Sequence, residues 1–279
     1  KELDKRKEAL FDLPVVEEVD EVKKMHLVGQ SQNTFREWNQ KWTDVSTKSF
    51  AELESQIFEV ESQNETFRFM KGKSAIESAE RTMTEMEEEV EGIRTGLKEL
   101  RETEERNSLA VQQALDVFEE LKTDLKEKKD NFGPALPEIQ KQVKNVEIEF
   151  TQFVTLNTSG DPIEAREVLD DAEKHTYEVQ AMMQKVPALY EDLDKTFPSQ
   201  IDELEKTHKK MMADDFVLPE DNFEERLGQV KKHVERSLED LEKIELGTVE
   251  TANKETAELI DDLYTTLEKE FEAKKYVLT

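Results

Sequence analysis

The chain has 279 residues, of which 38% are charged and 35% hydrophobic, and it contains only 8 glycines and 7 prolines. So few helix breakers favour long helices over a globule with many turns. The formal net charge of −28 excludes nucleic acid and anionic lipid as direct partners, because phosphate would be repelled at long range. The lack of cysteine excludes disulfides, a thiol nucleophile and cysteine-ligated zinc.

The first predicted elements surround the two tryptophans, in the stretch GQSQNTFREWNQKW from Gly29 to Trp42. Thr34 with Glu37 fits a capping box, so we expect a helix to begin near Thr34. One stripe of this helix would carry Phe35, Trp38, Trp42 and Val45. Large aromatic side chains on one stripe favour a core, with an exposed docking patch as the alternative. A short upstream helix is expected to pack on the stripe through Leu13, Val16, Val19, Val22 and Leu27.

A heptad pattern predicts a long helix from Ile76 to Leu125. Its seam is apolar except at the polar pair Glu104 and Asn107. The apolar seam positions are Ile76, Ala79, Met83, Met86, Val90, Ile93, Leu97, Leu100, Val111, Ala114, Phe118, Leu121 and Leu125. Such a seam is typical of a coiled coil, and a helix of about 50 residues would be about 75 Å long.

The same pattern recurs 86 residues later, from Pro162 to Met211. Because 86 is not a multiple of seven, one continuous heptad frame cannot explain both matches, and we interpret them as an internal repeat. The flanks agree with this shift. Phe50, Leu53, Ile57, Val60, Phe67 and Met70 correspond to Leu136, Ile139, Val143, Val146, Phe153 and Leu156.

Short turns are predicted between the helices of each repeat. The first turn would be Lys71–Ser74, with Ser74 and Glu77 as a capping box for the helix that follows. The second would be Thr158–Asp161, with Asp161 capping a helix that has proline at its first position. Gly72 and Gly160 are suited to end the preceding helices in a left-handed conformation.

Other breaks are sparse. Gly133–Pro134 and Val217–Asp221 are expected to interrupt the chain, and Pro187 and Pro198 to kink or interrupt the second long helix. One last helix would begin near Asp221, with Glu224 at the capping-box position, and would run toward Leu267.

These elements predict an all-α protein, an elongated spectrin-like repeat rod of long antiparallel helices packed as coiled-coil bundles. We divide it into 1–72 (N-terminal helices and the first helix of repeat 1), 73–157 (the long helix of repeat 1 and a linking helix), 158–216 (the long helix of repeat 2) and 217–279 (a closing helix running toward a following repeat). The tryptophans have no aromatic counterpart in the second repeat, so we interpret them as a terminal cap. Trp42→Ala should then lower the melting temperature, whereas loss of a partner at unchanged stability would favour docking.

No arrangement of residues points to catalysis. His26, His175, His208 and His233 are never three or four residues apart, so they form no helical zinc pair, and we expect all four to be exposed. Carboxylate clusters such as Glu87–Glu89 fall between seam positions and should face water. The chain also lacks the motifs of phosphate loops, nucleophile elbows and calcium loops. We therefore predict no catalytic residue, no metal ligand, no cofactor and no enzymatic activity.

Two further features could bind a partner but are expected to be structural. The pairs Met182–Met183 and Met211–Met212 each place one methionine on the seam. The basic stretch Lys206–Lys210 could dock an acidic partner, but a charge run on a helix is usually solvated. The partner-binding residues are thus left unassigned.

Two stretches resemble the EzrA septation-ring regulators of Gram-positive bacteria. Leu27–Gln30, followed by Phe35, Trp38 and Trp42, is similar to the N-terminal motif of that family, with Ser31 where the family often has threonine. A second element, near the middle of those proteins, is similar to Asp261–Tyr264 with Glu268–Glu270 and Ala273–Val277. The turn region Phe67–Phe69 also fits, and the resemblance covers the whole chain.

The resemblance implies the cytoplasmic part of a single-pass protein of the cell membrane, located at the division septum. A transmembrane helix is expected before Lys1, where the chain starts without methionine, and a further half after Thr279. It also implies a curved rod that binds the tubulin-like protein FtsZ, restrains its polymers and scaffolds other division proteins. The alternative is a purely structural spacer that links membrane division proteins without regulating FtsZ. Self-association also remains open.

Overall fold

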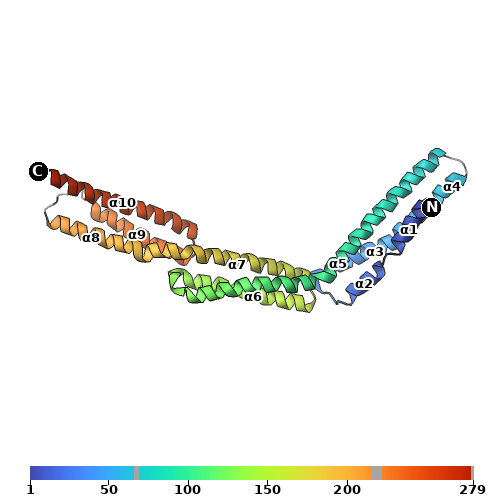
Figure 1. Ribbon diagram of the computed structural model, residues 1–279, viewed down its shortest axis with the longest axis horizontal. Helices are drawn as coiled ribbons and strands as arrows, with labels where there is room; N and C mark the ends of the chain where they lie inside the picture. Colours follow the sequence, from blue (N-terminus) through green and yellow to red (C-terminus); the bar gives the residue numbers. More distant parts are fainter. Residues whose placement is uncertain (66–68, 215, 217–221, 278–279) are drawn as a thin grey trace. The chain divides into compact units, whose positions relative to one another are not determined.

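The computed structural model describes residues 1–65, 69–214, 216 and 222–277, and the regular structure in these ranges is entirely helical (Figure 1). The long helices confirm the predicted all-α class. They are α1 (Glu2–Phe11), α2 (Val15–Lys23), α3 (Gly29–Asp44), α4 (Phe50–Glu65), α5 (Phe69–Glu127), α6 (Leu136–Ser159), α7 (Pro162–Glu191), α8 (Phe197–Ala213), α9 (Phe223–Glu242) and α10 (Leu246–Val277). Across the described ranges, these helices all lack the combination of length and apolar character that a membrane crossing requires.

The chain folds into two compact units. The first unit comprises Lys1–Ala114 with Glu149–Asp171, and the second comprises Leu115–Ile148 with Ala172–Thr279. Helices α5, α6 and α7 each contribute residues to both units. The division into four segments on the basis of the repeat stays a prediction.

In the first unit, three helical layers pack together. Ion pairs join Arg6 to Glu87 and Glu18 to Arg94, so α1 and α2 run in the same direction as α5. Phe11 packs edge-on against Phe50 with ring centroids 5.6 Å apart, and Lys7 pairs with Glu54 at 3.8 Å, so α4 runs antiparallel to α1. A π-helical turn, Val45–Ser49, joins α3 to α4.

The heptad seam of α5, from Met83 to Leu100, contributes to the core that these layers share. The seam positions from Ala79 to Leu100, Asn107 and those from Val111 to Leu125 are buried, as predicted. Ile76 is half-buried and Glu104 is exposed. Helix α5 has 59 residues and is therefore about 88 Å long.

In the second unit, α8, α9 and α10 lie side by side (Figure 1). Lys231 pairs with Glu205, and the ring of Phe223 stacks on that of His208 at 4.5 Å, so α9 is antiparallel to α8. Tyr264 bonds to Glu203 at 2.7 Å, which places α10 beside α8. The result is an up-down-up bundle of three helices.

The predicted first turn and its capping box are wrong. Lys71–Ser74 lie inside α5, which begins at Phe69, so Ser74 cannot cap it. A buried Gly72 in a helix costs about 1 kcal/mol relative to alanine, which the packing of the long seam outweighs. Helix α4 ends at Glu65, and residues 66–68, which include Phe67 and Arg68, lie outside the described residues.

The prediction of one closing helix is also wrong, because the chain turns between α9 and α10. Ile244 has φ +60°, and Glu245 N–H donates to the Asp240 carbonyl at 3.0 Å, which closes α9 through a left-handed residue. Glycine usually occupies such a position, so this stretch carried no turn signal. Helix α9 begins at Phe223, and the expected break Val217–Asp221 lies outside the described residues.

The prolines and the glycine break behave differently from one another. Pro198 follows a π-helical turn, Asp192–Thr196, which interrupts the second long helix as predicted. Pro187, however, lies within the unbroken helix α7. At Gly133 the chain forms 3-10 turns between α5 and α6 with φ +51°, so this break is confirmed.

Candidate functional site

The first motif shared with the EzrA regulators forms a joint between the starts of α3 and α7. We define the α3–α7 joint as Val28–Ser31 together with Gly160–Ile163. The carboxylate of Asp161 accepts the N–H of Gln30 at 2.9 Å, the N–H of Ser31 at 3.0 Å and the Ser31 hydroxyl at 2.7 Å. These two N–H groups, near the start of α3, are those that an N-cap residue normally satisfies. Asp161 therefore caps α3 from 130 residues away along the chain.

This distant cap explains why the predicted capping box at Thr34 is wrong. Helix α3 begins at Gly29, so Thr34 and Glu37 lie inside it. The residue before α3 is Val28, whose side chain cannot accept a hydrogen bond. Capping residues are predicted next to the helix in sequence, whereas the cap of α3 is Asp161, which lies between α6 and α7.

Asp161 also caps its own helix, as predicted. Its Oδ1 accepts the N–H of Glu164 at 3.4 Å, while the Ser31 hydroxyl oxygen accepts the N–H of Ile163 at 3.0 Å. Asp161 and Ser31 thus exchange caps between α3 and α7. The N–H of Asp161 itself donates to the Leu156 carbonyl at 3.0 Å, which closes α6 through Gly160 with φ +100°.

Burial makes the joint depend on the charge of one carboxylate. Asp161 is 2% exposed and Ser31 is fully buried. Burial by itself raises the pKa of Asp161, but hydrogen bonds from Ser31, Gln30 and Glu164 outweigh it, and the pKa lies below its ordinary value. The buried aspartate is therefore ionised and fully hydrogen-bonded at neutral pH.

Glycine in the Leu27–Gln30 motif is required by the joint. Gly29 has φ +57°, and a Cβ there would lie 2.1 Å from Asp161 Oδ2. Val28 N–H donates to the Gly160 carbonyl at 3.0 Å, which brings the two segments together. Threonine would offer the same hydroxyl as Ser31, so the departure from the family pattern leaves the bonds intact.

The aromatic stripe of α3 packs on the core of the first unit. Phe35, Trp38 and Trp42 are half-buried against the core cluster, and Val45 is fully buried. Trp38 lies on Gly96 of α5, where a Cβ would come within 2.2 Å of the indole. Lys41 covers the Trp38 ring at 4.5 Å. The prediction that Val16 packs on this stripe is wrong, because its side chain is exposed.

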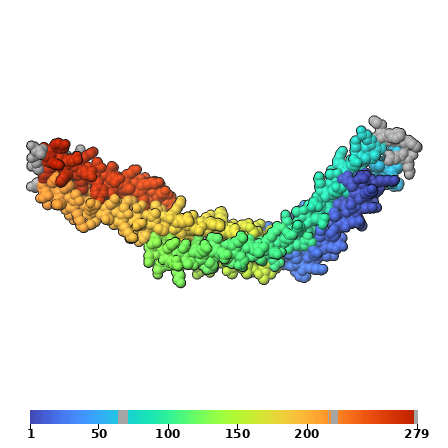
Figure 2. Space-filling model, in the orientation of Figure 1, coloured from blue at the N-terminus to red at the C-terminus, as the bar shows by residue number. Residues whose placement is uncertain are grey.

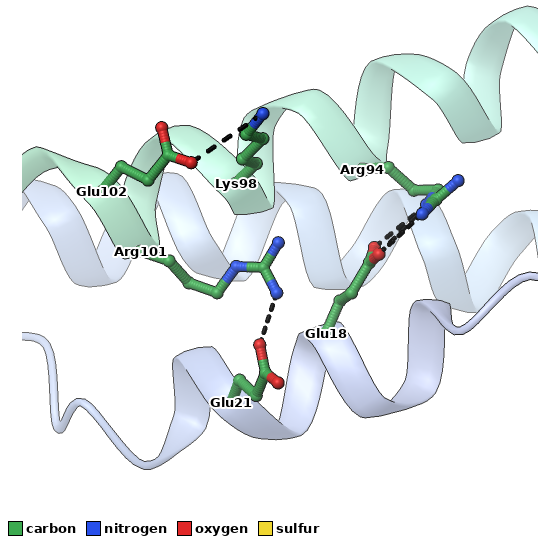
Figure 3. A network of polar contacts seen from close by, with 6 residues as sticks. All are labelled: Glu18, Glu21, Arg94, Lys98, Arg101 and Glu102. Atoms are coloured by element: carbon green, nitrogen blue, oxygen red, sulfur yellow. Dashed lines mark hydrogen bonds and ion pairs between the residues drawn. The ribbon is translucent and has the colours of Figure 1, made fainter.

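Ion pairs hold α2 against α5 (Figure 3). The guanidinium of Arg94 donates to both carboxylate oxygens of Glu18, at 2.9 to 3.2 Å, and Glu18 is buried. The hydrogen bond from Arg94 to Glu18 raises the pKa of Arg94, although burial opposes it. Arg101, seven residues after Arg94, pairs with Glu21, whose side chain is exposed. These pairs are structural, because each is used between two helices.

The expectation that all four histidines are exposed holds only for His26. His208 is 5% exposed, while His26 is exposed and His175 and His233 are half-buried. The π-helical turn before α8 adds a residue to one turn and rotates the buried stripe. Ile201 and His208 therefore face inward instead of Gln200 and Thr207. Within the described ranges, no group of three histidine, aspartate or glutamate side chains is placed to hold a metal ion.

The methionine pairs and the basic stretch are not brought together in one site. Met211 is buried and Met212 is exposed, while Met182 and Met183 are both half-buried. Lys206 pairs with Asp202 at 2.6 Å, and Lys209 and Lys210 face solvent. These observations agree with a solvated charge run.

Exposed apolar side chains mark other surfaces that sequence reasoning missed, because they lie off the seams. They are Phe11, Val16, Val28, Phe58, Leu109, Ile148, Val154, Tyr177, Met212, Phe271 and Tyr276. Phe11 and Phe271 each line a groove between two helices: Phe11 between α1 and α4, and Phe271 between α8 and α10.

Comparison with known proteins agrees with the motifs. Residues 1–279 match the family model described as "Septation ring formation regulator, EzrA". The Septation ring formation regulator EzrA of Enterococcus faecalis (strain ATCC 700802 / V583) is 66% identical over 278 residues, which cover 100% of this chain and 48% of that protein. The protein of the same name from Lactococcus lactis subsp. cremoris (strain MG1363) is 45% identical over 276 residues, which cover 99% of this chain and 48% of that protein.

This chain therefore spans about half the length of these curated relatives. No solved structure matches it. The match over every residue and the high identity settle the relationship, and the chain belongs to the EzrA family of septation ring formation regulators.

Proposed function

We propose that this chain is part of a regulator and scaffold of the bacterial division ring, which binds FtsZ and modulates its polymerisation at the membrane. The observation that carries the proposal is the match of all 279 residues to the family of septation ring formation regulators. The same family assignment supports a place at the division septum, on the cytoplasmic side of the cell membrane, with other division proteins as partners.

The charge of the chain limits how it would recognise FtsZ. A net charge of −28 offers no diffuse basic surface that could attract an acidic partner. Recognition would therefore use local features, such as exposed aromatic side chains next to a few charged ones. The long helices would supply stiff supports on which such features are held.

A structural spacer is the second candidate, and one observation favours it. The motif residues of the first resemblance, Gly29 and Ser31, are engaged in the α3–α7 joint, and Trp38 is packed on α5. These residues hold the first unit together, so little of their surface is left for contact with a partner. A spacer would affect reach between division proteins without changing FtsZ assembly.

Co-sedimentation separates the two candidates. The chain is incubated with FtsZ and GTP, and polymer is pelleted and inspected for bundles. We expect the chain to pellet with FtsZ and to change the amount or bundling of polymer. Omission of GTP is one control, and an unrelated acidic helical protein of similar net charge is the other. If the chain stays in the supernatant and the polymer is unchanged, the spacer is supported for this half of the protein.

A further inference from the structure

A groove of about 500 Å³ runs between α8 and α10 in the second unit. We call it the α8–α10 groove. Figure 2 shows the surfaces of these two helices, in orange and red, adjoining each other. Buried Met211 and Leu267 contribute to its apolar lining, together with the rings of Phe216 and Phe271.

The aromatic wall of the groove is fixed in place but open to a ligand. The rings of Phe216 and Phe271 stack nearly parallel, with centroids 6.1 Å apart. Lys274 holds this arrangement, since its ammonium lies 3.9 Å from the Phe216 ring and donates to the Asp214 carbonyl. Phe271 is nevertheless 60% exposed. A large, exposed and preorganised aromatic side chain is a typical anchor for a partner.

Negative charge dominates the lining of the groove. The carboxylates are Glu203, Asp214, Glu268 and Glu272, against Lys210 in the lining and Lys274 over the Phe216 ring. Tyr264 donates its hydroxyl to Glu203 at 2.7 Å, and burial together with this bond raises the pKa of Tyr264 to about 12. The tyrosine thus stays a neutral donor and positions Glu203.

These features select one kind of occupant. An acidic peptide or an anionic lipid would be repelled by the carboxylates, and a second copy of a chain with net charge −28 is disfavoured for the same reason. We propose that the α8–α10 groove binds a basic amphipathic segment of a partner protein. Its apolar residues would pack on Leu267 and Phe271, while its lysines or arginines would face Glu268 and Glu272.

The α8–α10 groove includes part of the second stretch that resembles the EzrA regulators. Tyr264 and Glu268 belong to the second stretch that resembles the EzrA regulators, and the structure places both in the groove. The inference does not rest on regulation of FtsZ, because it specifies only the chemistry of the bound segment.

Fluorescence anisotropy with a labelled model peptide tests the proposal on the chain 1–279. The probe is an amphipathic peptide of about 15 residues, with leucine and phenylalanine anchors at helical spacing and lysines on the flanks. A second peptide keeps the lysines but replaces the anchors by serine. We expect the first peptide to bind more tightly than the second, with an affinity that falls as salt is added.

Variants of α10 locate the binding. Glu268→Lys combined with Glu272→Lys is expected to weaken binding by about tenfold, and Phe271→Ala by about fivefold. The matched control is Glu255→Lys, an exposed carboxylate on the opposite face of α10, which should change affinity by less than about twofold. All of these side chains are exposed, so circular dichroism should show unchanged helicity.

Three outcomes would overturn the proposal. If Glu255→Lys weakens binding as much as the double variant, the peptide is attracted only by the overall charge. If the serine peptide binds equally well, the apolar lining is not used. If the peptide does not bind and Phe271→Ala abolishes self-association in sedimentation, a second copy of the chain occupies the groove.

Discussion

Asp161 satisfies backbone donors at the starts of two helices, and both helix dipoles point their positive ends at its carboxylate. Four hydrogen bonds from Gln30, Ser31 and Glu164 converge on a side chain that is almost entirely buried. A charge in such a place is stable only while every bond is made. A small chemical change at this residue should therefore destabilise the first unit.

Replacing Asp161 by asparagine tests this role. Asp161→Asn keeps the shape but removes the charge and turns an amide N–H₂ toward the donors of Ser31 or Gln30. We expect the free energy of unfolding to fall by about 2 kcal/mol, measured by urea denaturation. Asp171→Asn, at an exposed position further along α7, should change it by less than about 0.5 kcal/mol. Equal effects of the two variants would contradict the cap.

The pH dependence of the same variant has a defined sign. Because the pKa of Asp161 is lower in the folded chain than its usual value of about 3.9, the stability that it contributes is fully present above pH 3.9. That contribution is lost as the pH falls through the lowered pKa. The stability difference between the parent chain and Asp161→Asn should thus be constant near pH 7 and shrink below about pH 4. If the stability difference between the two chains grows as the pH falls, the lowered pKa of Asp161 would be contradicted.

The two ion pairs on α2 should contribute differently to stability because one is buried and the other is exposed. Glu18 is buried and accepts bonds from Arg94 at both oxygens, whereas Glu21 is exposed where it meets Arg101. Glu18→Gln should lower the free energy of unfolding by about 2 kcal/mol, and Glu21→Gln by less than about 1 kcal/mol. Urea denaturation at low and high salt measures both. A larger effect at Glu21 would show that burial does not decide the strength of these pairs.

At the scale of elements, the seam of α5 could be predicted because it depends only on local periodicity. Thirteen of the fifteen seam positions of α5 are buried, and the periodicity that marks them can be read without knowledge of their partners. The cap of α7 by Asp161 was predictable for the same reason, since the capping residue adjoins the helix. Prediction from the sequence succeeds where the stabilising contacts are made within a few helical turns along the chain.

The predictions that were wrong concern features that depend on distant parts of the chain. The start of α3 depends on a carboxylate 130 residues away, and the inward face of His208 depends on a π-helical turn upstream. Ile244 adopts a left-handed conformation that sequence rules reserve for glycine. The α8–α10 groove is likewise formed by residues from two helices, so neither sequence segment indicates it alone.

Packing of α3 on α5 can be tested at two glycines of one helix. A Cβ at Gly96 would overlap Trp38, whereas a Cβ at Gly92 meets nothing within 4 Å. Gly92→Ala should stabilise by up to about 1 kcal/mol through helix propensity. Gly96→Ala should instead destabilise by about 1 to 3 kcal/mol and change the tryptophan emission, because the indole must move. Equal stabilisation by both substitutions would show that Trp38 does not depend on the glycine.

At the scale of the whole molecule, three helices contribute residues to both units, and the two units carry different optical signals. Trp38 and Trp42 both belong to the first unit, so tryptophan fluorescence reports its unfolding alone. Far-ultraviolet circular dichroism reports the helices of both. Because α5, α6 and α7 continue from one unit into the other, melting of one unit must fray helices that the other requires.

A core substitution in the second unit tests this coupling. Leu241→Ala removes a fully buried side chain of α9 and should cost about 2 to 4 kcal/mol. If unfolding is cooperative across the shared helices, the fluorescence midpoint in urea will fall together with the circular dichroism midpoint, although no tryptophan lies in that unit. Leu109→Ala, an exposed leucine of α5, should move neither. An unchanged fluorescence midpoint beside a biphasic dichroism curve would instead mean that the units unfold independently, and that each shared helix can melt in part.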